Sequence, residues 1–256
     1  MYDTPGVPRA LGELTTRLPL FVAADEEPVL AAIRAGKDRL AAVLLSLPYG
    51  RVVSREFLEK LREVCTASGV LFVFDEIVTG FRLARGGAQE LYGIEADYVC
   101  VSKALAAGMP LSAVAGPRKY LDAMDGLQVS TTFGGELLSL AACEAALGIY
   151  RTKNYFEHLA DLGRRLREAV NEAAGNVGAP LRVLGYDAIP FFLFDPDPLR
   201  HAALMRTFQG EMAARGVLLR RDVNFLCGAH TAEQMDFTAD ATRESLKAMK
   251  AAGAFG

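Results

Sequence analysis

Short apolar runs alternate with amphipathic stretches over roughly the first half of the chain. Runs rich in Val, Leu, Phe or Tyr occur at residues 40–47, 71–74, 98–101 and 112–115. Runs of this length and composition are typical of parallel strands that are buried on both faces. Apolar residues at helical spacing separate them, over 26–35 and between Ser54, the predicted N-cap, and Gly69, the predicted helix end. This order predicts an α/β fold with a mostly parallel sheet and crossover helices.

The pattern changes in the second half of the chain. Residues 136–150 are apolar on almost every side, which predicts a helix buried on several sides, including at a subunit interface. Asn154 and Glu157 resemble a capping box at the start of the next helix, and Thr231 and Gln234 resemble one at the start of the last helix. Between these helices we expect short strands at 181–184, 191–194 and 217–220, and a helix at 199–215. The predicted parts are an α/β domain (1–150), a bridging helix (151–175) and a small α+β domain (176–256).

Composition narrows the class of protein. The 256 residues are 51% apolar with a net charge of −3, and acidic and basic residues are interspersed without a basic run. Nucleic acid and anionic membranes are therefore unfavourable partners. No apolar stretch is long enough to span a bilayer and the N-terminus lacks a signal-peptide pattern, so we expect a cytoplasmic protein.

Cysteine and histidine usage favours neither a disulfide framework nor a structural metal. The four cysteines are far apart in the sequence and lie mostly in apolar contexts, as expected of reduced core residues: Cys65, Cys100, Cys143 and Cys227. The three histidines, His158, His201 and His230, are also widely separated. Such residues are most often surface or capping groups, and we assign them no catalytic role.

Two charged residues stand where predicted strands end. Asp75 directly follows the run 71–74, and Lys103 comes just after the run 98–101. The carboxyl ends of parallel strands line the ligand crevice of an open α/β sheet, so both side chains should face one pocket. One interpretation is a structural ion pair. The other is a lysine that is made nucleophilic by apolar surroundings and forms a Schiff base, with the carboxylate as partner of a cofactor ring nitrogen.

Three segments in order resemble the motifs of class III aminotransferases, in particular the glutamate-1-semialdehyde aminomutase-like branch. They are DEIVTGFR (75–82), SKALAAGMPLSAVAG (102–116) and STTFGGE (130–136). The separation between Asp75 and Lys103, 103 − 75 = 28 positions, also suits that family. The resemblance favours the Schiff-base interpretation over the ion pair.

The resemblance implies a fold type I enzyme with pyridoxal 5'-phosphate as cofactor and part of its large, cofactor-binding domain in residues 1–150. Lys103 would hold the cofactor as a Schiff base and shuttle a proton, and Asp75 would bind the pyridinium N–H. Ile77 would pack on one face of the ring, and Thr132 would reach the phosphate held by the neighbouring subunit of a dimer. From the residues alone, Thr132 could instead be an ordinary helix cap. Glu76 is expected to be a solvated or structural charge, and for Arg82 a structural and a functional role remain equally open.

The chain also departs from the family pattern. The N-terminal segment, the Gly/Ser loop that holds the phosphate and the aromatic residue that stacks on the ring would lie ahead of Met1. Leu47 stands where the family usually has an acidic residue before proline. A sheet without its first strands should expose edges and apolar helix faces, which favours a homodimer or a complex with a chain that supplies the missing half.

Three functions therefore remain open. The first is an aminotransferase or aminomutase that acts on an amine or amino acid and a keto or aldehyde acceptor. The second is a catalytically impaired homologue that serves as a subunit or scaffold. The third is a lyase or racemase that uses the same Schiff base.

Overall fold

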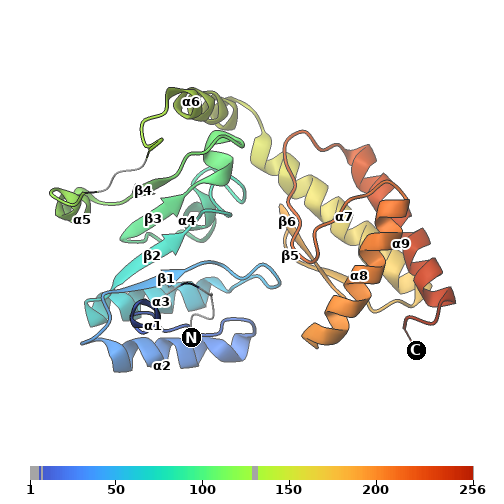
Figure 1. Cartoon of the computed structure of the whole chain (residues 1–256), viewed down its shortest axis with the longest axis horizontal. Coiled ribbons are helices and arrows are strands. Elements are labelled where there is room, and N and C mark those ends of the chain that lie inside the picture. The colour runs from blue at the N-terminus through green and yellow to red at the C-terminus, as the bar shows by residue number, and fades with distance from the viewer. Residues whose placement is uncertain (1–5, 7, 129–131, 256) are drawn as a thin grey trace.

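The computed structural model describes residue 6, residues 8–128 and residues 132–255. The chain forms two bodies: an N-terminal body, α1 to α6, around a four-stranded sheet, and a C-terminal body, α7 to α9, around a two-stranded sheet (Figure 1). The elements of the N-terminal body are α1 (Arg9–Gly12), η1 (Ala23–Asp25), α2 (Glu26–Gly36), β1 (Ala42–Leu45), α3 (Arg55–Ser68), β2 (Leu71–Asp75), α4 (Gly87–Tyr92), β3 (Tyr98–Val101), η2 (Lys103–Ala106), β4 (Ala113–Ala115), α5 (Arg118–Leu121), η3 (Asp122–Met124) and α6 (Leu137–Thr152). Those of the C-terminal body are α7 (Tyr155–Val177), β5 (Arg182–Tyr186), β6 (Ile189–Leu193), α8 (Pro198–Ala214) and α9 (Ala232–Ala251).

The larger sheet has the order β1-β2-β3-β4. Its first three strands are parallel and are joined by crossovers that contain α3 and α4. The prediction of a mostly parallel sheet with crossover helices is therefore confirmed.

The last strand of this sheet differs from the prediction. β4 runs antiparallel to β3, and all three of its residues are exposed. The connection over residues 102–112 contains only the 3₁₀ turn η2, and a parallel return needs a crossover of about a dozen residues or more, usually with a helix. The chain therefore reverses at this point, and the prediction of a buried parallel strand at 112–115 is wrong.

Local capping signals are confirmed where the side chain can reach its partner. Ser54 Oγ accepts a hydrogen bond from the Phe57 N–H at 3.1 Å, and Gly69 ends α3 with a φ of +66°. The capping box of Thr231 and Gln234 also forms at the start of α9. Asn154, by contrast, makes no side-chain cap for α7, and no strand forms over 217–220.

A hydroxyl network joins the two bodies. Tyr186 and Ile189, from the β5–β6 hairpin of the C-terminal body, are buried in the core of the N-terminal body. The hydroxyls of Tyr186 and Tyr92 lie 2.9 Å apart, and Tyr92 donates to the Val53 carbonyl at 3.0 Å. Burial raises the pKa of both tyrosines, so they remain neutral hydrogen-bonding groups.

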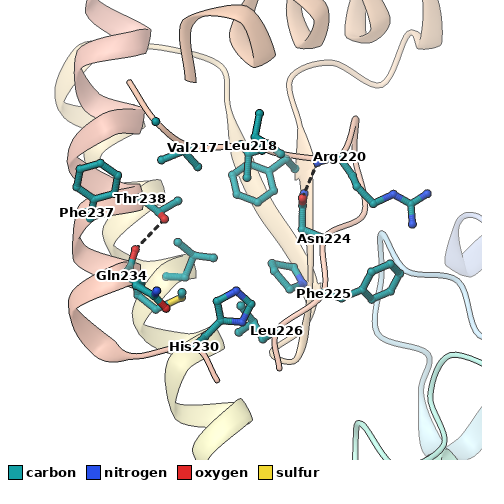
Figure 2. A pocket seen from close by; sticks show the side chains of 16 residues that line it. Val217, Leu218, Arg220, Asn224, Phe225, Leu226, His230, Gln234, Phe237 and Thr238 are labelled. Atoms are coloured by element: carbon teal, nitrogen blue, oxygen red, sulfur yellow. Dashed lines mark hydrogen bonds between the residues drawn. The ribbon is translucent and has the colours of Figure 1, made fainter. Parts of the chain in front are cut away.

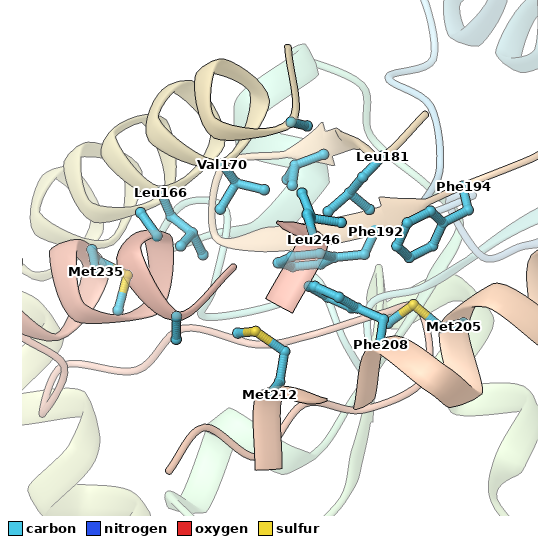
Figure 3. Packing of buried hydrophobic residues seen from close by; sticks show 14 of the residues in the cluster. Leu166, Val170, Leu181, Phe192, Phe194, Met205, Phe208, Met212, Met235 and Leu246 are labelled. Atoms are coloured by element: carbon cyan, nitrogen blue, oxygen red, sulfur yellow. The ribbon is translucent and has the colours of Figure 1, made fainter. Parts of the chain in front are cut away.

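The C-terminal body has its own hydrophobic core, in which α7, α8 and α9 cover the small sheet (Figure 3). Phe208 of α8 packs edge-on against Phe194, with ring centroids 5.4 Å apart. On α7, Leu166 and Val170 are buried in this core, and α7 makes extensive contacts with α9. The predicted bridging helix thus contributes to the C-terminal core; the domain boundaries themselves stay a prediction.

Among residues 8–128 and 132–255, no helix combines the length and the apolar composition that crossing a bilayer requires. The cysteines are free, and Cys227 is exposed, so the expectation of a core position is wrong for that residue.

His201, near the start of α8, is one of the buried titratable groups of the C-terminal body. Its Nδ1 accepts a hydrogen bond from the Phe194 N–H at 3.3 Å, whereas its buried Nε2 has no partner among the described residues. Burial lowers the pKa of His201; Asp222 and Asp195 oppose this shift and Arg221 reinforces it.

We predict that the free energy of unfolding falls as the pH drops below about 6.5. Below that pH His201 is protonated in the unfolded state but stays neutral in the folded state. The free energy of unfolding therefore continues to fall until the pH reaches the lowered pKa of the folded state. His201→Asn keeps an acceptor for Phe194 and removes the titration, so its stability should fall less than that of the wild type over this range. Urea unfolding at a series of pH values measures the difference, and parallel stability curves would contradict the prediction.

Candidate active site

The register of β2 and β3 brings Asp75 and Lys103 to the same edge of the sheet. Asp75 is the last residue of β2 and pairs with Cys100 of β3. Lys103 lies two positions after Val101, the last residue of β3. Both residues therefore lie at the carboxyl ends of adjacent parallel strands, where α/β proteins bind ligands.

The Asp75 carboxylate keeps most of its capacity to accept hydrogen bonds. The side chain is half-buried, and its Oδ1 accepts one hydrogen bond, from the Ile77 N–H at 3.0 Å. It makes no ion pair with any described residue. The hydrogen bond from the Ile77 N–H orients the Asp75 carboxylate and leaves Oδ2 available to a ligand.

Lys103 has a strained backbone and an amine that pairs with no other described residue. Its φ of +48° lies in the left-handed region, which costs a non-glycine residue on the order of 1–3 kcal/mol and is common at functional sites. Ser102 supports the turn, since its Oγ donates to the Leu111 carbonyl at 2.8 Å. Lys103 makes no ion pair within the described chain, so the structural ion pair with Asp75 is wrong. Its side chain is exposed, so the predicted apolar burial of this lysine is also wrong for a single copy of the chain.

The third motif lies partly outside the described residues, because 129–131 include Ser130 and Thr131. Thr132 is described and exposed. It does not cap α6, because the carboxylate of Glu136 accepts hydrogen bonds from the N–H groups of Leu138 and Ser139, the latter at 2.8 Å. The helix-cap interpretation of Thr132 is therefore wrong.

Glu76 is buried and structural, not solvated. Its side chain is 1% exposed and accepts hydrogen bonds from the N–H groups of Ala88 and Gln89, both at 2.9 Å, and from the Thr79 hydroxyl. A side chain at Gly87, where φ is +70°, would collide with this carboxylate. The start of α4 is thus built around a buried negative charge.

Arg82 links the two bodies. Its Nη1 donates to the Leu226 carbonyl of the C-terminal body at 2.6 Å, and its Nε donates to the Val78 carbonyl at 3.2 Å. The guanidinium also lies over the Phe225 ring, 5.1 Å from the centroid. Burial lowers the pKa of Arg82, although an arginine stays charged. The structure therefore assigns Arg82 a role in positioning the C-terminal body.

Tyr49 and Arg220, which the sequence did not single out, share an electrostatic environment with Asp75. Tyr49 follows β1, and its carbonyl packs so closely on Gly185 of the β5–β6 hairpin that a side chain at Gly185 would collide with it. Burial raises the pKa of Tyr49; the charge of Asp75 adds to this shift and the charge of Arg220 opposes it. Asp75 and Arg220 therefore both lie within electrostatic reach of the same phenol.

A cavity of about 510 Å³ lies elsewhere, in the C-terminal body, between the loop 216–226 and α9 (Figure 2). Its walls are mainly apolar and include Phe192, Val217 and Met235. None of the four predicted site residues lines it. No group of three or more His, Cys, Asp or Glu residues within the described ranges could hold a metal ion.

Solved structures with this architecture define the class of protein. FumI of Sphingopyxis sp. MTA144, described as a pyridoxal phosphate (PLP) internal aldimine form, matches with a TM-score of 0.82 and 26% identity over 94% of this chain and 62% of that chain. A transaminase described as having PLP bound matches with a TM-score of 0.87 and 27% identity over 98% of this chain and 61% of that chain. The fold is that of the fold type I PLP-dependent aminotransferases.

Sequence relatives define the family. The family model for class III aminotransferases matches residues 21–221. Glutamate-1-semialdehyde 2,1-aminomutase of Syntrophobacter fumaroxidans is 33% identical over 98% of this chain and 62% of its own length. The enzyme of the same name from Clostridium novyi is 32% identical over 88% of this chain and 57% of its own length. The chain belongs to the class III aminotransferase family, and it spans only those shares of the relatives' lengths.

We predict that Glu76→Gln destabilises the protein strongly. The amide would turn an NH₂ group toward donors that now bind a carboxylate, which should lower the free energy of unfolding by about 2–4 kcal/mol. Glu95→Gln, at an exposed position close to the same helix, is the control and should change stability by less than about 0.5 kcal/mol. Chemical denaturation compares the two variants, and equal effects would show that the buried carboxylate is not needed.

Proposed function

We propose that this chain binds pyridoxal 5'-phosphate and carries out amino-group transfer, as an aminotransferase or aminomutase. The observation that supports this most is the placement of Asp75 and Lys103 at one sheet edge, with neither residue in an ion pair to another described residue. Family membership and the PLP described for the solved structures point the same way.

The residues at the sheet edge fit the cofactor chemically. Asp75 has a free acceptor oxygen for a protonated ring nitrogen, and Lys103 has an unpaired amine that can react with an aldehyde. In this proposal Ile77 packs on the ring and Thr132 binds the phosphate of a neighbouring subunit. The exposure of both Thr132 and Lys103 is consistent with a site that a second chain completes.

When bound, the cofactor supplies an electron sink that stabilises negative charge on the substrate carbon. Asp75 maintains that capacity by holding a proton on the ring nitrogen. Lys103 Nζ would accept the proton that the substrate carbon loses and would hold it for return later in the transfer. The Ile77 N–H keeps the Asp75 carboxylate oriented during these steps.

The substrates in this proposal are an amine or amino acid and a keto or aldehyde acceptor. A lyase or racemase would use the same two residues but would not transfer nitrogen to an acceptor. A catalytically impaired subunit would not bind the cofactor at Lys103.

All four cysteines are free, which suits a reducing compartment such as the cytoplasm.

We also propose that the face around β4 and α6 is covered by another chain, either a second copy or one that supplies the part of the relatives' length not spanned here. Large apolar side chains are exposed on this face. They include Val114 (49%), Leu137 (78%), Leu138 (64%), Leu140 (45%) and Ile149 (49%). Several large apolar side chains exposed on two elements of one body are typical of an interaction site.

For the cofactor, we predict that sodium borohydride reduction of the protein with pyridoxal phosphate attaches the cofactor covalently to Lys103. Peptide mass spectrometry locates the label. Lys103→Arg should abolish it and lower amino transfer by about 10²- to 10⁴-fold, the range that general acid–base groups contribute. Lys60→Arg, at an exposed position on α3, is the control and should keep the label. An unlabelled Lys103 in the wild type would rule out the proposed function.

For the assembly, we predict that Leu137→Glu weakens subunit association. A charge at this position would have to be desolvated in the interface, so the dissociation constant should rise about 10- to 100-fold. Leu199→Glu, in α8, is the matched control because Leu199 is 81% exposed on the other body. Analytical ultracentrifugation measures both variants: Leu199→Glu should sediment like the wild type, and a Leu137→Glu variant that does the same would contradict the proposed interface.

A further inference from the structure

Tyr150, near the end of α6, reaches the turn that contains Lys103. Its hydroxyl donates a hydrogen bond to the Ala104 carbonyl at 2.7 Å, and α6 packs against η2 in the same region. The Tyr150 side chain is only 7% exposed. Burial raises its pKa to about 12, so the phenol keeps the proton that it donates. The residue directly after Lys103 is therefore tied to a helix 46 positions further along the chain.

Other aromatic side chains hold the Tyr150 ring in place. The ring stacks on Phe81, with centroids 5.7 Å apart and an angle of 17° between the planes. It also packs against Tyr155 and Phe156 at the start of α7, at centroid distances of 4.8 Å and 5.7 Å. Phe81 belongs to the segment 75–82 that begins with Asp75. Because the ring is packed on several sides, the direction in which its hydroxyl points is fixed.

The turn that Tyr150 contacts has a strained backbone at both ends. The φ angles of Lys103 and Ala107 are +48° and +49°, in the left-handed region that residues with a side chain disfavour. Within the turn, the Ala104 carbonyl also accepts a hydrogen bond from the Ala107 N–H, but at 3.4 Å, which is longer than usual for such bonds. The bond from the Tyr150 hydroxyl has the ordinary length for its type, so it contributes more to holding this carbonyl.

We propose that Tyr150 is a positioning residue for Lys103: its hydroxyl holds the Ala104 carbonyl and, with it, the left-handed backbone from which the amine extends. The proposal rests on the function proposed above. A backbone conformation that costs free energy persists only where surrounding contacts hold it. Without the hydroxyl, the turn would spend part of its time at ordinary backbone angles. A change of φ at Lys103 would then move the amine away from the sheet edge that it shares with Asp75, and small misplacements of a reacting group slow its reactions.

Tyr150→Phe tests the proposal, because it keeps the ring and removes only the hydroxyl. Quenching with borohydride at timed intervals, followed by peptide mass spectrometry, measures the rate at which pyridoxal phosphate attaches to Lys103. In the variant this rate should be about 3- to 10-fold lower than in the wild type, the effect expected of one hydrogen bond. Hydrogen exchange of the backbone amides of residues 103–109, measured without cofactor, should be faster by a similar factor.

Tyr92→Phe is the matched control. The Tyr92 hydroxyl also donates to a backbone carbonyl, that of Val53 at 3.0 Å, and the Tyr92 side chain is 6% exposed. Tyr92→Phe should lower the free energy of unfolding in urea without slowing attachment at Lys103.

Ala107→Gly supplies a rescue. Glycine adopts a positive φ without steric cost, and Ala107 is exposed, so the substitution relieves strain in the turn and removes no buried contact. Combined with Tyr150→Phe, it should recover most of the lost attachment rate.

The outcomes separate this inference from the proposed function. A labelled wild type together with an unchanged rate in Tyr150→Phe overturns the inference alone, whereas an unlabelled wild type overturns both. Equal slowing in Tyr92→Phe would show that the hydroxyl acts through general stability, and failure of Ala107→Gly to rescue Tyr150→Phe would show that it does not act through the turn. Either result also overturns the inference.

Discussion

Parallel pairing of β2 with β3 is the constraint on which the candidate site depends. Hydrogen bonds between these strands fix their register, and the pairing of Asp75 with Cys100 sets where each strand ends relative to the other. The ladder continues one step further, since the Glu76 N–H donates to the Cys100 carbonyl at 2.9 Å. A shift of one residue in this register would turn the side chains of β2 to the opposite faces of the sheet. The acid and the amine share an edge because this backbone pairing holds them there.

Asp75 and Glu76, two adjacent acids at the end of β2, have different roles. Successive side chains in extended backbone point to opposite sides, so Asp75 and Glu76 enter different environments. Glu76 is buried, and N–H groups at the start of α4 satisfy it, whereas Asp75 is half-buried and keeps an oxygen available. The Glu76 carboxylate stabilises the start of α4, and the Asp75 carboxylate is left available for a ligand.

The junction between the two bodies combines apolar burial with directed polar contacts. Tyr186 and Ile189 of the small hairpin enter the core of the N-terminal body, and Arg82 reaches in the other direction to the Leu226 carbonyl. Phe225, next to Leu226 in the same loop, packs against the core of the N-terminal body and lies under the Arg82 guanidinium. The placement of this loop therefore depends on contacts from both bodies.

Signals that act over a few residues were readable in the sequence. They include the Ser54 cap of α3, the Thr231–Gln234 capping box and the strand–helix alternation, because each depends on local hydrogen bonds or side-chain periodicity. The motifs around Asp75 and Lys103 were found instead by their resemblance to the class III aminotransferases. Only the tertiary structure decided the reversal of β4, the exposure of Lys103, the burial of Glu76 and the contact between Arg82 and Leu226, which are 144 positions apart. Burial and long-range pairing depend on which distant segments meet. That meeting is set by the packing of the whole chain and not by neighbouring residues.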